Sequence, residues 1–158
     1  VHLNNRDTPQ EVRCMEKKLT LEIITPREIK YSGEIKLLVT PGPLSSLGIL
    51  PDHISLLTSI ESGEIMLRLP DNREIFFAIS EGILEVDLNH LSLLVEYARE
   101  ADEIDFEREK ELLAQALSDL SECNNQESRD KLKKDIKYIN TKLNVVNKQS
   151  AISSQLST

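Results

Sequence analysis

Histidine and cysteine, the side chains most often used for metal binding and nucleophilic catalysis, are few and widely spaced in this chain. The three histidines stand at positions 2, 53 and 90, and the two cysteines at positions 14 and 123. A zinc site needs several such ligands close together, and a Ser/His/Asp arrangement needs a partner for its histidine. Neither a Walker-type phosphate loop nor a dinucleotide glycine fingerprint is present. We therefore expect no catalytic residue, no metal site, free thiols, and a protein that is not itself an enzyme.

Charge and hydropathy exclude two further classes of protein. The net charge is −8 and the sequence pI is about 5.0, whereas binding of nucleic acid requires a basic surface. No run approaches the roughly 18–20 apolar residues that a membrane-spanning helix needs, and the first residues lack a signal-peptide pattern. The sequence predicts a soluble cytosolic protein without a nucleic-acid partner, attached to a membrane only through a complex.

Glycine and proline divide the chain into two parts. All five glycines and all six prolines lie at or before position 82. Before that point, apolar and polar residues alternate in runs such as 19–23 and 64–69, which is typical of half-buried strands. Turn residues separate these runs, so residues 18–99 are predicted to form a β-sandwich or barrel. Residues 1–17 and 149–158 show no periodicity and are predicted to be a disordered extension and a flexible tail.

The part without glycine or proline predicts two helices over 100–148. Asp105 is a candidate N-cap for the first helix, and Ser128 for the second. A polar stretch at 123–127 separates them, which favours an antiparallel hairpin. The second helix has an apolar seam at steps of four and three, formed by Leu132, Ile136, Ile139, Leu143 and Val146.

The two predicted helices differ in charge. Residues 105–122 hold six acids and two bases (−4), whereas residues 128–148 hold seven bases and two acids (+5). Two explanations stay open: the helices attract each other, or the second helix binds an acidic partner. The candidates for that partner contact are Arg129, Lys131, Lys133, Lys134 and Lys137.

Two segments resemble a known family. Residues 47–58 match a Leu-Gly-Ile-x-Pro-x-His segment followed by Leu-Leu-Thr, and residues 80–86 match a Ser-Gly-Gly-aliphatic-x-Glu-Val strand except for Glu81. With the order of a β domain and a helical hairpin, the chain resembles the epsilon subunit of F-type, proton-translocating ATP synthase. The resemblance spans roughly 18–148. It implies an α+β fold, with a β-sandwich of about ten strands followed by a C-terminal antiparallel two-helix hairpin.

The resemblance also implies partners and a role. The sandwich is expected to dock on the gamma subunit and the c-ring of the rotor, on the cytoplasmic face of a bacterial plasma membrane. The hairpin is expected to inhibit ATP hydrolysis when it extends toward the alpha and beta catalytic subunits. The interface candidates on the sandwich are Ser45, Ser46, Leu47 and His53. Ser45 and Ser46 stand where the family often has an acidic segment.

A regulatory ATP site is the remaining implication of the resemblance. Some bacterial members bind ATP through an Ile/Leu-Asp-x-x-Arg-Ala motif, and Asp105 and Arg108 match it. Glu109 stands where alanine is expected. The alternative for these two residues is a helix cap and a first-turn ion pair. For the whole chain, the alternatives are a free-standing β-domain adaptor with a coiled-coil tail, and an ATP-sensing module.

Overall fold

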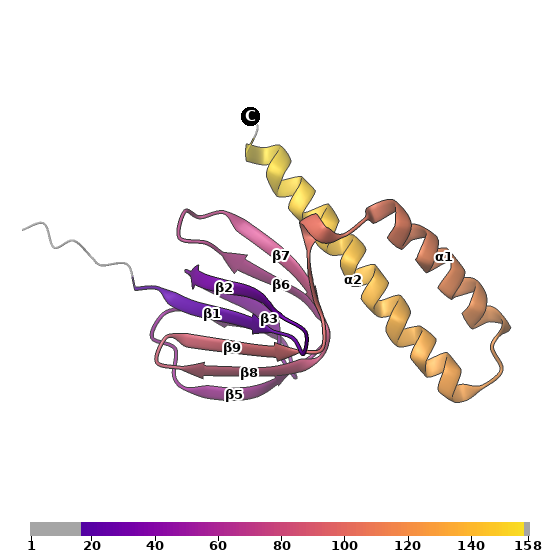
Figure 1. Cartoon of the computed structure of the whole chain (residues 1–158), viewed down its shortest axis with the longest axis horizontal. Helices are drawn as coiled ribbons and strands as arrows, with labels where there is room; N and C mark the ends of the chain where they lie inside the picture. The colour runs from indigo at the N-terminus through magenta and orange to yellow at the C-terminus, as the bar shows by residue number, and fades with distance from the viewer. Residues whose placement is uncertain (1–16, 157–158) are drawn as a thin grey trace, which may run out of the picture.

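The computed structural model describes residues 17–156 and shows two five-stranded sheets packed face to face, with a helical hairpin projecting beyond them (Figure 1). The strand order in sheet A is β2 (Ile29–Ile35), β1 (Leu19–Ile24), β9 (His90–Val95), β8 (Gly82–Asp87) and β5 (Leu56–Ile60). The order in sheet B is β10 (Ala98–Glu100), β7 (Glu74–Ile79), β6 (Gly63–Arg68), β3 (Leu37–Pro41) and β4 (Ser46–Ile49). The predicted α+β class, a sandwich of about ten strands with a two-helix hairpin, is confirmed.

The core lies between the sheets and is almost entirely aliphatic. Leu19, Leu21 and Ile23 of β1 are fully buried, and so are Ile65 and Leu67 of β6. These are the residues whose alternation predicted strands, and each contributes roughly 1.5–3 kcal/mol on burial. Within sheet A, β1 pairs antiparallel with β2 and in parallel with β9.

The helices begin where short polar side chains cap them. Asp105 accepts a hydrogen bond from the backbone N–H of Arg108 (3.2 Å), which confirms it as the N-cap of α1 (Phe106–Glu122). The second helix, α2, spans Gln126–Leu156. Its cap is Asn125, whose side-chain oxygen accepts from the N–H of Glu127 (3.0 Å), so the prediction of Ser128 was wrong. Asn125 offers the same chemistry three residues earlier.

The predicted boundaries need one further correction. A flexible tail was expected over 149–158, but α2 continues without interruption to Leu156. The helix is stabilised there by contact with the sandwich, a cause that local periodicity does not reveal. The predicted disordered extension, residues 1–17, lies outside the described residues except for Lys17. No helix within residues 17–156 is long and apolar enough to cross a bilayer.

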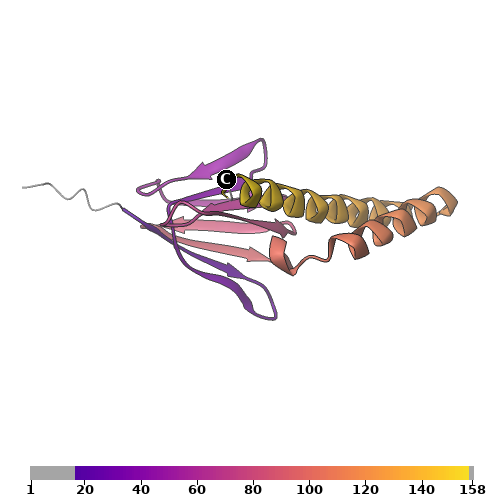
Figure 2. The same cartoon turned by 90° about the horizontal axis from the view of Figure 1, so that it is seen from above.

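The C-terminal half of α2 covers part of sheet B, whereas α1 packs along α2 and projects away from the sheets (Figures 1 and 2). Val145 is fully buried against Phe76 and Ala78 of β7 and against Ala101 in the short 3₁₀ helix η1 (Ala101–Glu103). The part of the outer face of sheet B that α2 covers is therefore apolar.

Candidate interaction surfaces

The outer face of sheet A carries a row of aliphatic side chains that nothing in the described chain covers. The strand register joins Ile29 to Ile24, Ile24 to Leu94, and Leu94 to Ile83. Ile29, Leu94 and Ile83 are 57%, 45% and 50% exposed. Leu57 lies beside this row on β5 and is 73% exposed. We call these five residues the sheet A patch.

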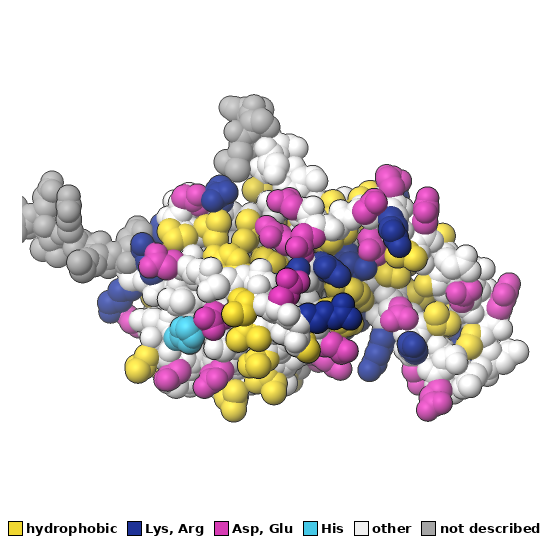
Figure 3. Space-filling model, viewed as in Figure 1, with side chains coloured by type: hydrophobic (Ala, Val, Ile, Leu, Met, Phe, Trp, Pro, Cys, Tyr) yellow, Lys and Arg dark blue, Asp and Glu magenta, His cyan; other side chains and the backbone are white. Residues whose placement is uncertain are grey.

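Figure 3 shows the patch as hydrophobic side chains gathered over β9, β8 and β5. A contiguous exposed apolar surface of this kind marks a site of protein contact, whereas isolated exposed aliphatics are ordinary. The patch is therefore a better candidate for docking than any single loop of the sandwich.

The sequence analysis missed this patch, although a signal was present. In a strand, consecutive residues point to opposite faces. The pairs Ile23-Ile24, Ile83-Leu84 and Leu93-Leu94 therefore place one aliphatic in the core and one outside. Aliphatic doublets inside otherwise alternating strands indicate a sheet that is apolar on both faces.

The four predicted sandwich contacts do not form one surface. Ser45 closes the β3–β4 turn by accepting from the N–H of Gly42 (2.9 Å), and Ser46 begins β4. Leu47 is half-buried and packs against the core. His53 lies in the loop after β4, where its Nδ1 is 2.8 Å from the carbonyl oxygen of Ile54. The serines and His53 thus lie at opposite ends of β4.

The loop that contains His53 is fixed to the β8–β9 turn. Asp52 donates its N–H to the side chain of Asn89 (2.6 Å), and the Asn89 amide donates to the Asp52 carboxylate (3.2 Å). Hydrogen bonds from Lys17 and Asn89 lower the pKa of Asp52 below its ordinary value. Leu88 in the turn is 88% exposed and has a positive φ of 46°, a conformation that leucine rarely adopts.

The basic residues of α2 have different surroundings. Arg129 donates to the carbonyls of Leu120 (3.3 Å) and Cys123 (3.0 Å), so it satisfies the end of α1. Lys131 and Lys133 are exposed. Lys134 and Lys137 line a cavity of about 280 Å³ together with Glu61, Glu81 and Glu96 of the sandwich. In this arrangement, the acids that face Lys134 and Lys137 belong to the sandwich.

One ion pair does join the two helices. The Lys142 ammonium lies 2.7 Å from Glu109 Oε2, with both side chains about seven-eighths buried (14% and 13% exposed), although the angles are not those of a hydrogen bond. Lys142 also lies over the ring of Tyr138 (4.7 Å), which packs on Tyr97 of the sandwich (4.4 Å between ring centroids). Burial raises the pKa of Tyr138.

The two ATP-site candidates lie at the start of α1, with Asp105 as its N-cap and Arg108 in its first turn. Asp105 uses its carboxylate for the cap, and the Arg108 side chain is exposed. Glu109, at the position where alanine was expected, is engaged by Lys142. The ATP role of Asp105 and Arg108 therefore stays a prediction.

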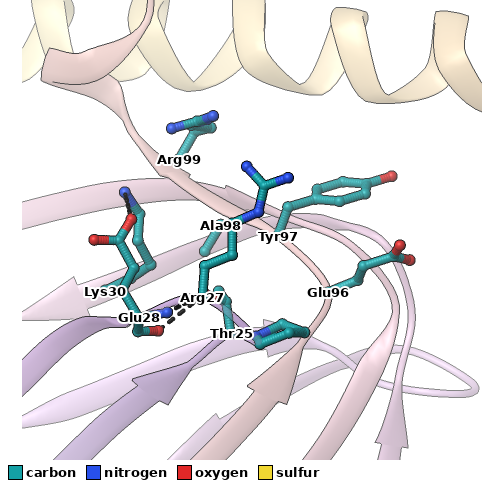
Figure 4. Close-up of a pocket in the computed structure, with 9 residues that line it drawn as sticks. Thr25, Arg27, Glu28, Lys30, Glu96, Tyr97, Ala98 and Arg99 are labelled. Carbon is teal, nitrogen blue, oxygen red and sulfur yellow. Dashed lines mark hydrogen bonds and ion pairs between the residues drawn. The ribbon is translucent and has the colours of Figure 1, made fainter.

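A cavity of about 480 Å³ lies at the β1–β2 turn and holds charges of both signs (Figure 4). Lys30 in its wall pairs with Glu28 (3.4 Å) and Glu103 (3.1 Å). Burial opposes ionisation of Glu103, but the hydrogen bonds from Lys30 and from the Glu100 N–H, together with the charges of Lys30 and Arg99, outweigh it and lower the pKa. Arg27 and Arg99 line the same cavity. Among residues 17–156, no group of three or more His, Cys, Asp or Glu side chains could hold a metal ion.

The described chain is a ten-stranded β-sandwich followed by a C-terminal helical hairpin, with an exposed apolar surface on sheet A. The profile of the family described as "ATP synthase, Delta/Epsilon chain, beta-sandwich domain" matches residues 18–101. The chain belongs to this ATP synthase delta/epsilon family.

Named relatives agree with the family. An ATP synthase epsilon chain of Citrifermentans bemidjiense is 38% identical over 106 residues, which cover 67% of this chain and 76% of that one. The epsilon chain of Persephonella marina is 35% identical over 102 residues, 65% of this chain and 75% of that one. A chain in the Euglena gracilis mitochondrial ATP synthase OSCP/F1/c-ring structure shares the fold, with a TM-score of 0.65 at 15% identity over 85% of this chain and 80% of that chain.

Proposed function

We propose that this chain is a non-catalytic central-stalk subunit of an F-type ATP synthase, which helps couple c-ring rotation to ATP synthesis. Its partners are the gamma subunit, the c-ring and the alpha and beta catalytic subunits. The observation that carries the proposal is the sheet A patch, an apolar surface suited to permanent contact with another subunit, on a chain of the delta/epsilon family. The bacterial relatives support a place on the cytoplasmic face of a bacterial plasma membrane.

The sheet A patch is assigned to the gamma subunit. The other apolar outer face, on sheet B, is occupied by α2. A stable partner must therefore use sheet A if it is to bind without displacing the hairpin. The predicted contacts Ser45, Ser46 and Leu47 line a groove of about 240 Å³ beside the fully exposed Leu44, at a separate position suited to the c-ring.

The helical hairpin is proposed to inhibit ATP hydrolysis when α2 leaves the sandwich. Lys131, Lys133, Lys134 and Lys137 would then be free to meet acidic loops of the catalytic subunits. Arg129 is better placed to hold the hairpin turn, because it binds the carbonyls at the end of α1.

Co-purification and truncation test the proposal together. A tagged chain should recover a membrane-bound ATPase with its gamma and catalytic subunits, and a chain that ends at Glu122 should still assemble but hydrolyse ATP faster. Recovery of an unrelated coiled-coil partner instead would favour the adaptor alternative. A shift in melting temperature with millimolar ATP would favour the ATP-sensing alternative.

A further inference from the structure

The edge of β7 is only partly paired with β10. The register joins β10 to residues 77–79 of β7, so residues 74–76 have no strand beside them on that edge. Gln149 of α2 occupies this position. Its side-chain Oε1 accepts from the N–H of Phe76 (3.2 Å), and its Nε2 donates to the carbonyl oxygen of Glu74 (3.1 Å). One side-chain amide thus makes the two hydrogen bonds that a neighbouring strand would make.

The apolar contacts of α2 with the sandwich fix the position of α2 along the sheet less well than the two Gln149 hydrogen bonds do. Tyr138, Val145 and Ile152 pack on this side and are spaced seven residues apart, which is two helical turns. A repeat of this kind permits a slip by seven residues, because one apolar residue replaces another. The same slip would bring Lys142 or Leu156 to the position of Gln149, and neither side chain can both donate and accept a hydrogen bond.

A wrong register would leave the Phe76 N–H and the Glu74 carbonyl without partners beside a buried apolar contact. Unpaired buried backbone groups are costly, whereas the correct register satisfies both. Polar groups within apolar contacts are known to select one register among several. Lys148, the residue before Gln149, pairs with Glu64 on β6 and so adds to the same register.

We propose that Gln149 is the positioning residue that selects the folded-back arrangement of the hairpin by completing the edge of β7. The inference rests on the proposed function for its regulatory meaning, because a hairpin released from the sandwich is the inhibitory form there. Loss of the Gln149 hydrogen bonds should therefore favour the released form and lower ATP hydrolysis, which is opposite to the effect of removing α2.

Amide hydrogen exchange in the full-length chain tests the contact directly. In a Gln149→Leu variant, exchange at Phe76 should accelerate about 5- to 30-fold, the factor expected for one to two neutral hydrogen bonds. Asn147→Leu is the matched control, because Asn147 is exposed on the same helix. Unchanged exchange at Phe76 in Gln149→Leu, or equal acceleration in both variants, would overturn the proposal.

A second variant separates hydrogen bonding from packing. Gln149→Glu keeps an acceptor for the Phe76 N–H but loses the donor to Glu74 while its carboxyl is ionised. Protonation restores an O–H donor. The ionised carboxylate would also repel the Glu74 carbonyl oxygen and so weaken the whole contact. Exchange at Phe76, corrected for its intrinsic pH dependence, should therefore be fast at pH 7 and recover protection near pH 4. A purely steric role predicts no such recovery, and that result would also reject the proposal.

ATP hydrolysis by the assembled complex then distinguishes the positioning role of Gln149 from the proposed inhibitory function of the hairpin. If exchange responds as expected but neither Gln149→Leu nor truncation at Glu122 changes hydrolysis, the positioning role stands and the proposed inhibitory function fails. If truncation raises hydrolysis but exchange at Phe76 is insensitive to Gln149, the function stands and the positioning role fails.

Discussion

The two outer faces of the sandwich have similar chemistry and opposite surroundings. On sheet B, Phe76, Ala78 and Met66 pack under Val145 of α2. On sheet A, Ile83 and Leu94 have comparable apolar surface and nothing from the described chain on them. A sheet exposed to water on one side usually alternates apolar and polar residues. Both sheets here depart from that alternation. The apolar outer face of sheet B is covered by a helix of the same chain, and that of sheet A is proposed to be covered by a partner.

This difference separates stability from assembly. Changes to the covered face should be visible in the isolated chain, because the contact they break is intramolecular. Changes to the sheet A patch should leave the isolated chain folded and alter only its association. Each variant below tests one side of that distinction.

The largest effect is expected from a charge at the centre of the covered face. Val145→Asp would bury an unpaired carboxylate at a fully buried position, which costs about 3 kcal/mol or more. We expect α2 to leave the sandwich while the ten strands stay folded. Hydrogen exchange over 66–78 and proteolysis near residue 104 should both accelerate. Asn147→Asp on the exposed side is the control, and equal acceleration in it would contradict the prediction.

The opposite outcome is expected for the sheet A patch. Ile83→Thr combined with Leu94→Thr keeps β-branched or strand-compatible side chains but removes much of the apolar surface. The free energy of unfolding of the isolated chain should change by only about 1 kcal/mol, since both positions are half-exposed. Affinity for the gamma subunit should fall about tenfold or more.

Binding measured by co-purification or calorimetry checks this result. Leu117→Gln is the control, because Leu117 on α1 has a similar exposure of 49%. Undiminished gamma binding by the double variant would remove the patch from the interface.

A smaller loss of stability is expected when the ion pair between α1 and α2, formed by Lys142 and Glu109, is broken. Lys142→Met leaves Glu109 partly buried without its counter-charge, which should weaken the hairpin by about 1–3 kcal/mol. Adding Glu109→Gln should recover most of that loss in urea titrations. Lys110→Met, which breaks an exposed pair with Glu107, should cost less than about 0.5 kcal/mol. Equal losses at the two sites would show that burial of the pair is unimportant.

The smallest effect is expected from Tyr138→Phe. The Tyr138 hydroxyl is buried without a hydrogen-bond partner in the described residues, so its removal should change stability by less than about 0.5 kcal/mol or increase it. The raised pKa means that the folded state holds the phenolic proton more tightly than the unfolded state does. Ionisation of Tyr138 therefore leaves stability unchanged below the ordinary pKa of about 10 and lowers it as pH rises beyond that value.

Melting curves between pH 8 and pH 11 measure this contribution. The alkaline loss of stability should be shallower in Tyr138→Phe than in the parent chain. Tyr31→Phe, at a half-buried tyrosine within the sandwich, provides a comparison whose effect should not involve α2.

The sequence predicted the sandwich because the core strands obey a period of two, and it predicted Asp105 because a cap is a local feature. It did not predict Val145, since the visible seam of α2 uses Val146 and the neighbouring Leu143. A helix that contacts both a second helix and a sheet has two apolar stripes. In the sequence, the periodicity of the stripe that faces α1 obscures the stripe that faces the sheet. The extension of α2 to Leu156 and the role of Gln149 depend on contacts with the sandwich. The local sequence of α2 does not reveal these contacts.

The interface candidates show the same limit. Ser45, Ser46 and His53 are close in sequence, but β4 runs between them and separates them in space. Most residues of the sheet A patch are far apart in sequence and become neighbours only through the register of five strands. Surface sites on sheets are therefore predicted poorly from a single segment.

The parallel pairing of β1 with β9 has a consequence for how the protein is made. Thr20 lies opposite His90 and Ile24 opposite Leu94, so the first described strand waits for one that is synthesised some seventy residues later. Contacts of such long sequence separation slow folding. During translation, β1 and β2 can form only a hairpin whose open edge invites misassociation. Sheet A can be completed only after β9 has been synthesised, and sheet B only after β10, so α2 is made last and packs on strands that precede it in the chain.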